Sequence, residues 1–236
     1  MQTTFDTIIW GPSLEGIDRA IELKNEGKQV LLAGKFGFPG GKATEALSCL
    51  FPVNYFEKRE LYRSILQRIE KLKYGVLFRN AQYVLFHPEA IKRVCWELLN
   101  ENEIQRLFHV IPLSVSYEGE PGIELFGREG RFSLTAGNVV DLSDDRYLDN
   151  LKREEKRWSV IINSFFSDPL PADFSGFQIL RQFETSIGQY VSVIEKNVSS
   201  NAVETTFNRE LDRLSKESWR KHQARILMVP VYPELT

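Results

Sequence analysis

The chain has 236 residues, of which 42% are hydrophobic and 26% are charged, a composition that suits one large globular domain or two small ones. With 30 lysine and arginine residues against 32 aspartate and glutamate residues, the formal net charge is −2. This balance gives no electrostatic reason to expect a nucleic acid or a membrane surface as partner.

Targeting signals and cysteine motifs are not apparent in the sequence. Residues 1–4 contain no basic residue, and the apolar run after them is too short for a secretory signal peptide. No stretch approaches the roughly 20 apolar residues that span a bilayer. The two cysteines, Cys49 and Cys95, are far apart, which excludes a disulfide scaffold and a CxxC metal or redox site. We therefore expect a soluble, reduced, cytoplasmic protein.

Residues 5–44 form a complete strand, turn, helix and strand pattern. A short apolar run ends at Gly11, and a helical apolar face made by Ile17, Ile21 and Leu23 follows until residues 25–27. Residues 30–33 are a second apolar run. Two buried strands joined by such a helix predict parallel pairing through a right-handed crossover, the unit with which dinucleotide-binding domains begin.

This stretch resembles the N-terminal FAD-binding segment of FAD-dependent oxidoreductases with a glutathione-reductase-like flavin domain. In that family the first turn reads G-x-G-x-x-G, a small residue follows four positions later, the second strand ends in an acidic residue, and a G-G-x-x-T element comes next. The corresponding residues here are Gly11, Ser13, Gly16, Ala20, Gly34 and the run Gly40-Gly41-Lys42-Ala43-Thr44. The resemblance implies FAD as the cofactor.

Two positions of this fingerprint depart from the family pattern. Ser13 replaces the glycine that lets the backbone approach the pyrophosphate, so its side chain would crowd the phosphates or would have to hydrogen-bond them. Gly34 carries no carboxylate for the ribose hydroxyl groups. The sequence therefore predicts weakened or lost flavin binding, which a Ser13→Gly plus Gly34→Glu change should strengthen.

Residues 45–80 are expected to leave the first sheet in a partly helical excursion, and the residues after them are expected to complete that sheet. Residues 45–50 are helix-like, residues 57–72 predict an amphipathic helix, and residues 83–86 a strand followed by a helix over 87–99. We expect a third parallel strand over 106–112 beside the first strand, then an antiparallel meander over 115–118, 123–126 and 131–134. By the resemblance, Lys42 and Thr44 approach the flavin; without it, they are a loop lysine and a capping threonine.

A second turn also resembles the family, in which an apolar strand leads into a D-A-T-G-D-like turn against the cofactor. Asp141 and Asp145 match, whereas Leu142 and Asp144 replace smaller residues. A carboxylate beside the dinucleotide would repel it. The cofactor-binding residues that the resemblance implies are Gly11, Pro12, Ser13, Leu14, Gly16, Gly34, Lys35, Gly40, Gly41, Lys42, Ala43, Thr44, Ser143 and Asp145.

The pattern changes at residue 151, where a run of mixed charge marks a domain boundary. Strands are predicted over 158–166, 177–183 and 188–194, a helix over 201–223 and a closing strand over 226–231. The fold class is thus α/β: a Rossmann-like parallel sheet of the FAD/NAD(P)-binding type with an antiparallel meander over 1–150, and a smaller α+β substrate-like domain over 151–236.

Three functions are compatible with this sequence. The chain is an FAD-dependent oxidoreductase relative with weakened binding, a non-catalytic interaction or regulatory subunit (a pseudoenzyme) on the same fold, or an α/β protein that binds another nucleotide or metabolite in the same crevice. Family members continue into a further flavin-binding segment, which a protein partner or a second copy of this chain would supply. No motif identifies catalytic residues or a metal site, because His87, His109 and His222 lie in three separate elements.

Overall fold

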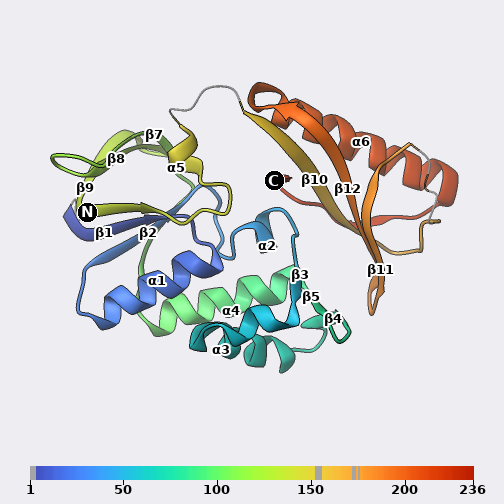
Figure 1. The fold of residues 1–236 in the computed structure, drawn as a ribbon, viewed down its shortest axis with the longest axis horizontal. Coiled ribbons are helices and arrows are strands. Elements are labelled where there is room, and N and C mark those ends of the chain that lie inside the picture. Colours follow the sequence, from blue (N-terminus) through green and yellow to red (C-terminus); the bar gives the residue numbers. More distant parts are fainter. Residues whose placement is uncertain (1–3, 152–155, 172–173, 175) are drawn as a thin grey trace. The chain divides into compact units, whose positions relative to one another are not determined.

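The computed structural model describes residues 4–151, 156–171, 174 and 176–236 (Figure 1). The chain divides into two compact units, residues 1–41 with 91–153 and residues 42–90 with 154–236. Residues 42–90 thus group with the C-terminal part of the chain. The division into domains at residue 150 stays a prediction.

The first unit contains a six-stranded sheet in the order β6-β2-β1-β9-β8-β7. Its strands are β1 (Thr4–Trp10), β2 (Val30–Gly34), β6 (Gln105–Phe108), β7 (Ile111–Ser116), β8 (Gly122–Gly127) and β9 (Gly130–Asp141). Its helices are α1 (Leu14–Asn25), α5 (Tyr147–Asn150) and most of α4 (Pro88–Glu101). The pairings β1–β2, β2–β6 and β1–β9 are parallel, and the pairings of β8 with β7 and β9 are antiparallel.

The predicted crossover from β1 through α1 to β2 is confirmed. Ile8 pairs with Leu31, and both are buried in the sheet. Helix α1 contacts both strands and buries Ile17 and Leu23 of the predicted apolar face together with Ala20, whereas Ile21 is only partly buried (Figure 1). The parallel sheet of the first unit therefore begins as a dinucleotide-binding fold begins.

Two expectations about this sheet are wrong. The third parallel strand, β6, lies beside β2, because β9 occupies the place beside β1. Residues 111 and 112 belong to β7. The strand expected over 131–134 and the apolar strand expected before the Asp141 turn are one strand, β9, whose first half pairs antiparallel with β8 and whose second half pairs parallel with β1.

The second unit contains two sheets. A five-stranded sheet has the order β11-β12-β10-β13, with β14 also paired to β10, and a three-stranded sheet has the order β3-β5-β4. The strands are β3 (Leu50–Pro52), β4 (Val76–Arg79), β5 (Tyr83–Phe86), β10 (Arg157–Phe166), β11 (Ile179–Thr185), β12 (Gly188–Ser199), β13 (Ile226–Met228) and β14 (Glu234–Leu235). The helices are α2 (Lys42–Glu45), α3 (Glu60–Glu70), α6 (Val203–His222) and the 3-10 turns η1 (Val53–Glu57) and η2 (Ser200–Ala202).

Helix α6 runs along the strands β10 and β12 (Figure 1). Its buried residues Phe207 and Leu214 share a hydrophobic core with Val160, Ile162 and other residues of the sheet. The predicted helix-like segment 45–50 is wrong: α2 ends at Glu45, and Leu47 has a left-handed φ of 51°. Across the described residues, the structure has no helix that is both long and apolar enough to cross a membrane.

Candidate functional site

The turn between β1 and α1 has the backbone shape that the glycine pattern predicts. Gly11 has a φ of 103°, and a Cβ added there would lie 2.3 Å from the backbone nitrogen of Ser143. A Cβ on Gly16 would lie 2.0 Å from the carbonyl oxygen of Gly11. Any side chain at either position would collide with backbone, so both glycines are required for the close approach of strand, helix and the 142–143 turn.

Ser13 connects this turn to the turn after β9. Its hydroxyl donates to the carbonyl oxygen of Leu142 at 2.7 Å and accepts from the backbone nitrogen of Gly16 at 3.0 Å. Ser13 is the N-cap of α1 and is only 4% exposed. The hydroxyl that replaces the family's glycine is therefore used within the protein, in a bond that joins the two fingerprint turns.

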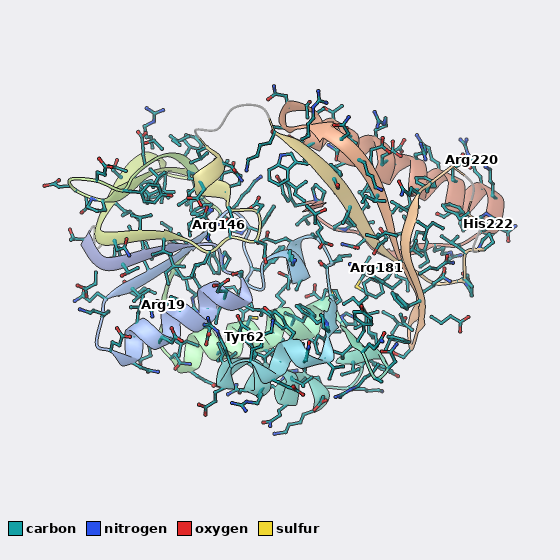
Figure 2. The ribbon with its side chains drawn as sticks, viewed as in Figure 1. Arg19, Tyr62, Arg146, Arg181, Arg220 and His222 are labelled. Carbon is teal, nitrogen blue, oxygen red and sulfur yellow. The ribbon has the colours of Figure 1, made fainter. Side chains whose placement is uncertain are left out.

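Asp141 and Ser143 hold the second turn in place. One carboxylate oxygen of Asp141 accepts from the nitrogen of Ser143 at 3.0 Å and from its hydroxyl at 2.5 Å. The other accepts from the nitrogen of Leu148 at 2.7 Å, at the start of α5. Arg146, labelled in Figure 2, donates to the carbonyl oxygen of Asp141 at 3.0 Å and lies 3.2 Å from Asp149. The side chain of Asp141 thus stabilises the turn and the short helix.

Gly41 lies against both turns. A Cβ on Gly41, where φ is 55°, would be 2.2 Å from Oδ2 of Asp144 and 2.9 Å from Cα of Ser13. The nitrogen of Gly40 donates to the carbonyl oxygen of Pro12 at 2.7 Å. Residues 11–14 and 39–41 are all buried. The Gly40–Gly41 segment therefore packs on the start of α1, where the helix dipole favours an anion, and the carboxylate of the exposed Asp144 lies beside Gly41.

The turn after β9 is acidic at the same place. Burial raises the pKa of Asp145, and the neighbouring charges of Asp141 and Asp144 raise it further, against the hydrogen bonding that lowers it. Burial is the main reason that the ionised form of Asp145 is disfavoured, and the two neighbouring carboxylates add to it. A second anion, such as a pyrophosphate, would be repelled there.

Gly34 and Pro12 fill the end of the second strand. A Cβ on Gly34 would lie 2.7 Å from Cδ and 2.8 Å from Cγ of Pro12. The pyrrolidine ring thus occupies the space in which the side chain of the family's acidic residue would begin. The sequence has no carboxylate at position 34 to bind the ribose, and the Pro12 ring occupies the place where its side chain would begin.

The other predicted site residues lie in two groups. In the first unit, Leu14 is buried in the first turn of α1, and Lys35 follows β2 with Nζ 5.7 Å from the ring centre of Tyr147. Helix α2, in the second unit, contains Lys42, Ala43 and Thr44. Nζ of Lys42 lies 3.8 Å from Glu234, and Thr44 is buried. The flavin-facing role of Lys42 and Thr44 stays a prediction.

A buried polar cluster in the second unit was not predicted from the sequence. Nδ2 of Asn163 donates to the carbonyl oxygen of Ala46 at 2.9 Å and to Glu234 at 3.2 Å. Its Oδ1 accepts from the hydroxyls of Tyr190 at 2.9 Å and Ser192 at 2.6 Å. The signal was an asparagine inside the apolar run 158–166. Because the hydrogen bonds of Asn163 and Tyr190 hold residues 46–47 and the side chain of Glu234 on β10 and β12, the cluster is structural.

Each of the three histidines has a different partner within its own unit. Nδ1 of His87 accepts from the backbone nitrogen of Glu89, the ring of His222 lies 5.4 Å from that of Phe174, and His109 packs on Gly37. Among the described residues, no group of three or more histidine, cysteine, aspartate or glutamate side chains is placed to hold a metal ion.

The residues of the two turns do not fit FAD in the manner of the family fingerprint. The ribose acceptor is replaced by the Pro12 ring, and the start of α1 is packed against Gly41 and an aspartate. The shape of the fold is retained while its contact positions are filled by the chain itself.

Comparison with known proteins identifies the fold. A sequence model of the family described as FAD dependent oxidoreductase matches residues 6–148, more than half of the chain. No curated protein sequence matches.

Solved structures of low identity share the fold. An anhydrotetracycline hydroxylase from Streptomyces rimosus has a TM-score of 0.61 at 12% identity, over 98% of this chain and 52% of its own. A geranylgeranyl bacteriochlorophyll reductase-like protein from Thermoplasma acidophilum has a TM-score of 0.65 at 10% identity, over 100% and 67%. A myxobacterial chondrochloren halogenase, described as a variant of FAD-dependent halogenases, has 0.56 at 17%, over 99% and 63%. The chain spans about half the length of the first of these structures.

Proposed function

Because this chain belongs to the FAD dependent oxidoreductase family, we propose that it is a member whose flavin binding is weakened or lost and which does not catalyse a flavin reaction by itself. The observation that carries the proposal is the packing of Gly41, Ser13 and Asp144 at the start of α1, where Oδ2 of Asp144 would lie 2.2 Å from a Cβ on Gly41. A helix N-terminus that already faces a carboxylate gains little from a pyrophosphate.

The proposal is supported at a second, independent position. In dinucleotide-binding folds an acidic residue at the end of the second strand holds the ribose hydroxyls. Here that residue is Gly34, and the ring of Pro12 lies 2.7 Å from its added Cβ. In such folds the start of the first helix holds the pyrophosphate and the acidic residue holds the ribose. The proposal removes both contacts, so the two losses add in the binding free energy of FAD.

The test is a comparison of cofactor retention and activity. The purified chain is incubated with FAD, dialysed, and examined by absorbance, and the dialysed protein is assayed for oxidation of NADH and NADPH in the presence of added FAD. We expect no flavin absorbance after dialysis and no turnover above free FAD. Stoichiometric flavin that survives dialysis would overturn the proposal.

A second candidate function is that of an interaction subunit, which an edge of the first sheet favours. Strand β7 is the last strand in the sheet order, and Ile111, Leu113 and Tyr117 on or beside it are 46%, 38% and 47% exposed. Exposed apolar residues on an edge strand favour pairing with another chain. A protein partner or a second copy of this chain would then complete the flavin site.

Light scattering of the purified chain, with and without Leu113→Lys, tests the second-copy case, for which we expect a dimer that the substitution dissociates.

A further inference from the structure

A small cavity lies in the second unit between helix α6 and the sheet along which this helix runs (Figure 1). Its volume is about 80 Å³, which gives room for roughly five groups of the size of a water molecule. Its lining comes from β10, from β12, from α6 and from residues 176–178, which precede β11. All of these residues belong to the second unit, so the cavity does not use the two turns described above.

The register of β10 and β12 turns the side chain of Glu195 toward α6. Val160 pairs with Glu195, and Ile162 pairs with Val193. Residues directly opposite each other on antiparallel strands project to the same face of a sheet. Val160, Ile162 and Val193 are buried in the core that α6 shares with the sheet, so the exposed Glu195 projects to this face as well. The cavity thus has an apolar floor and a carboxylate in its lining.

Helix α6 contributes a second carboxylate, which two arginines already bind. Glu210 is only 5% exposed; one of its carboxylate oxygens accepts from Nε of Arg209 at 2.8 Å, and the other lies 3.2 Å from Nη1 of Arg213. The guanidinium group of Arg213 also donates to the carbonyl oxygen of Gly176 and lies 4.0 Å from the ring centre of Phe177. Arg213 therefore holds Phe177 in the wall of the cavity, and its charge is directed to Glu210.

Glu195 differs from Glu210 in that no cation of the protein binds it. Within the part of the chain that the structure describes, the side chain of Glu195 forms no ion pair and no hydrogen bond. A ligand that matches the lining therefore needs a short apolar chain for the floor and a cationic donor for this carboxylate. A primary alkylammonium group has both, because its carbon chain packs on apolar surface while its ammonium group donates charge-assisted hydrogen bonds.

We propose that this cavity binds a primary alkylammonium group, with the carbon chain on Val160, Ile162 and Val193 and the ammonium group on Glu195. A small free amine and a lysine side chain of another protein both carry this group. The inference goes beyond the proposed function and does not rest on it, since it uses no residue of the first unit.

The test is a titration of the isotope-labelled full chain with n-butylamine, 1-butanol and butyrate at neutral pH and constant ionic strength, followed by two-dimensional NMR. We expect n-butylamine to saturate one site with a dissociation constant on the order of 1 mM and to shift the signals of residues 160–162, 193–195 and 210–213. 1-Butanol keeps the chain but not the charge, so it should bind about tenfold or more weakly, and butyrate should be repelled. Equal affinities for n-butylamine and 1-butanol would overturn the proposal, as would signal shifts confined to other residues.

Two variants locate the ammonium group. Glu195→Gln should weaken n-butylamine about tenfold and leave the affinity for 1-butanol unchanged, because it removes the charge and keeps the shape of the side chain. Glu184→Gln is the matched control: Glu184 is an exposed acid of β11 outside the cavity lining, so its loss should change neither affinity. Binding of n-butylamine that Glu195→Gln leaves unchanged would refute the assignment.

Nα-acetyllysine methylamide distinguishes the two sources of the group. An affinity similar to that of n-butylamine supports the site as one for a lysine side chain, and binding about tenfold or more weaker supports it as one for a free amine. FAD retention by the chain would overturn the proposed function and leave all of these outcomes unaffected.

Discussion

The ring of Pro12 and the backbone of Gly34 occupy each other's space: a Cβ on Gly34 would lie 2.7 Å from Cδ of the proline. Each residue explains the other, since a side chain at position 34 requires a smaller residue at position 12. The pair closes the end of β2 at the point where dinucleotide-binding folds carry an acidic residue.

Restoring FAD binding therefore requires changes at both turns. The Ser13→Gly plus Gly34→Glu change suggested by the sequence leaves the Pro12 ring in place, so the contact of Pro12 with Gly34 revises that expectation: neither this double change nor Gly34→Glu alone should give saturable FAD binding. The triple variant Pro12→Gly, Gly34→Glu and Asp144→Gly supplies the acid, makes room for it and removes the carboxylate from the start of α1. We expect it to bind FAD more tightly than the wild type by about tenfold or more, since two unfavourable contacts are relieved. Fluorescence titration measures the difference, and equal affinities of the triple and single variants would contradict this account.

Ser13 should contribute to stability rather than to ligand binding. Ser13→Ala removes the N-cap of α1 and the bond to Leu142, and loss of a cap costs about 0.5–2 kcal/mol in the free energy of unfolding. Denaturant titration measures this loss. Ser133→Ala, at an exposed position of β9, is the control and should be close to neutral. A Ser13→Ala variant as stable as the wild type would show that the two bonds contribute nothing.

Asp145 should make the protein less stable at neutral pH than its amide variant. Its pKa is raised in the folded protein, so the folded state holds the proton more tightly than the unfolded state and stability from this group falls as pH rises through the folded pKa. Asp145→Asn should thus be more stable than the wild type at neutral pH. The difference should shrink toward zero as pH falls through the raised pKa toward the ordinary value of 3.8.

Thermal unfolding of both proteins across this pH range checks the sign for Asp145. Glu129→Gln, an exposed acid between β8 and β9, is the control for the loss of one charge. A wild type more stable than Asp145→Asn at neutral pH would mean that the carboxylate is favourably held.

Both cysteines should be unreactive in the folded protein. Burial raises the pKa of Cys95 to about 12, and burial together with the charge of Glu234 raises the pKa of Cys49. Because the thiolate is the reactive form, neither residue should be alkylated until the chain unfolds. Mass spectrometry after brief iodoacetamide treatment should find no label in buffer and two labels in denaturant. Rapid labelling of Cys49 in buffer would show that the segment after α2 opens.

Local pattern predicted much of the fold, and long-range pairing explains what it missed. The β1–α1–β2 unit follows from apolar spacing and glycines close together in sequence. The place of β6 depends on β9, which arrives beside β1 from more than 100 residues away and whose direction relative to β1 and β8 is set only by pairing. The segment 45–50 has helical composition, but hydrogen bonds donated by Asn163 to the carbonyl oxygen of Ala46 and by Tyr190 to that of Leu47 hold it in another conformation.

The sequence predicted where the candidate site lies, but it did not predict which residues contact one another there. The sequence located the two turns, because their glycines and acids follow apolar strands. It could not show that Ser13 bonds to Leu142, 129 residues away, or that Pro12 covers Gly34. These contacts arise because Trp10 pairs with both Ala33 and Asp141, which brings the three strand ends together.

The most direct test of the central claim is an equilibrium titration of the wild-type chain with FAD, followed by the quenching of flavin fluorescence. The packing of Gly41, Ser13 and Asp144 predicts no saturable quenching at micromolar protein concentrations. Saturation at one FAD per chain with a micromolar or lower dissociation constant would contradict the account, because the turns would then have to open for the pyrophosphate.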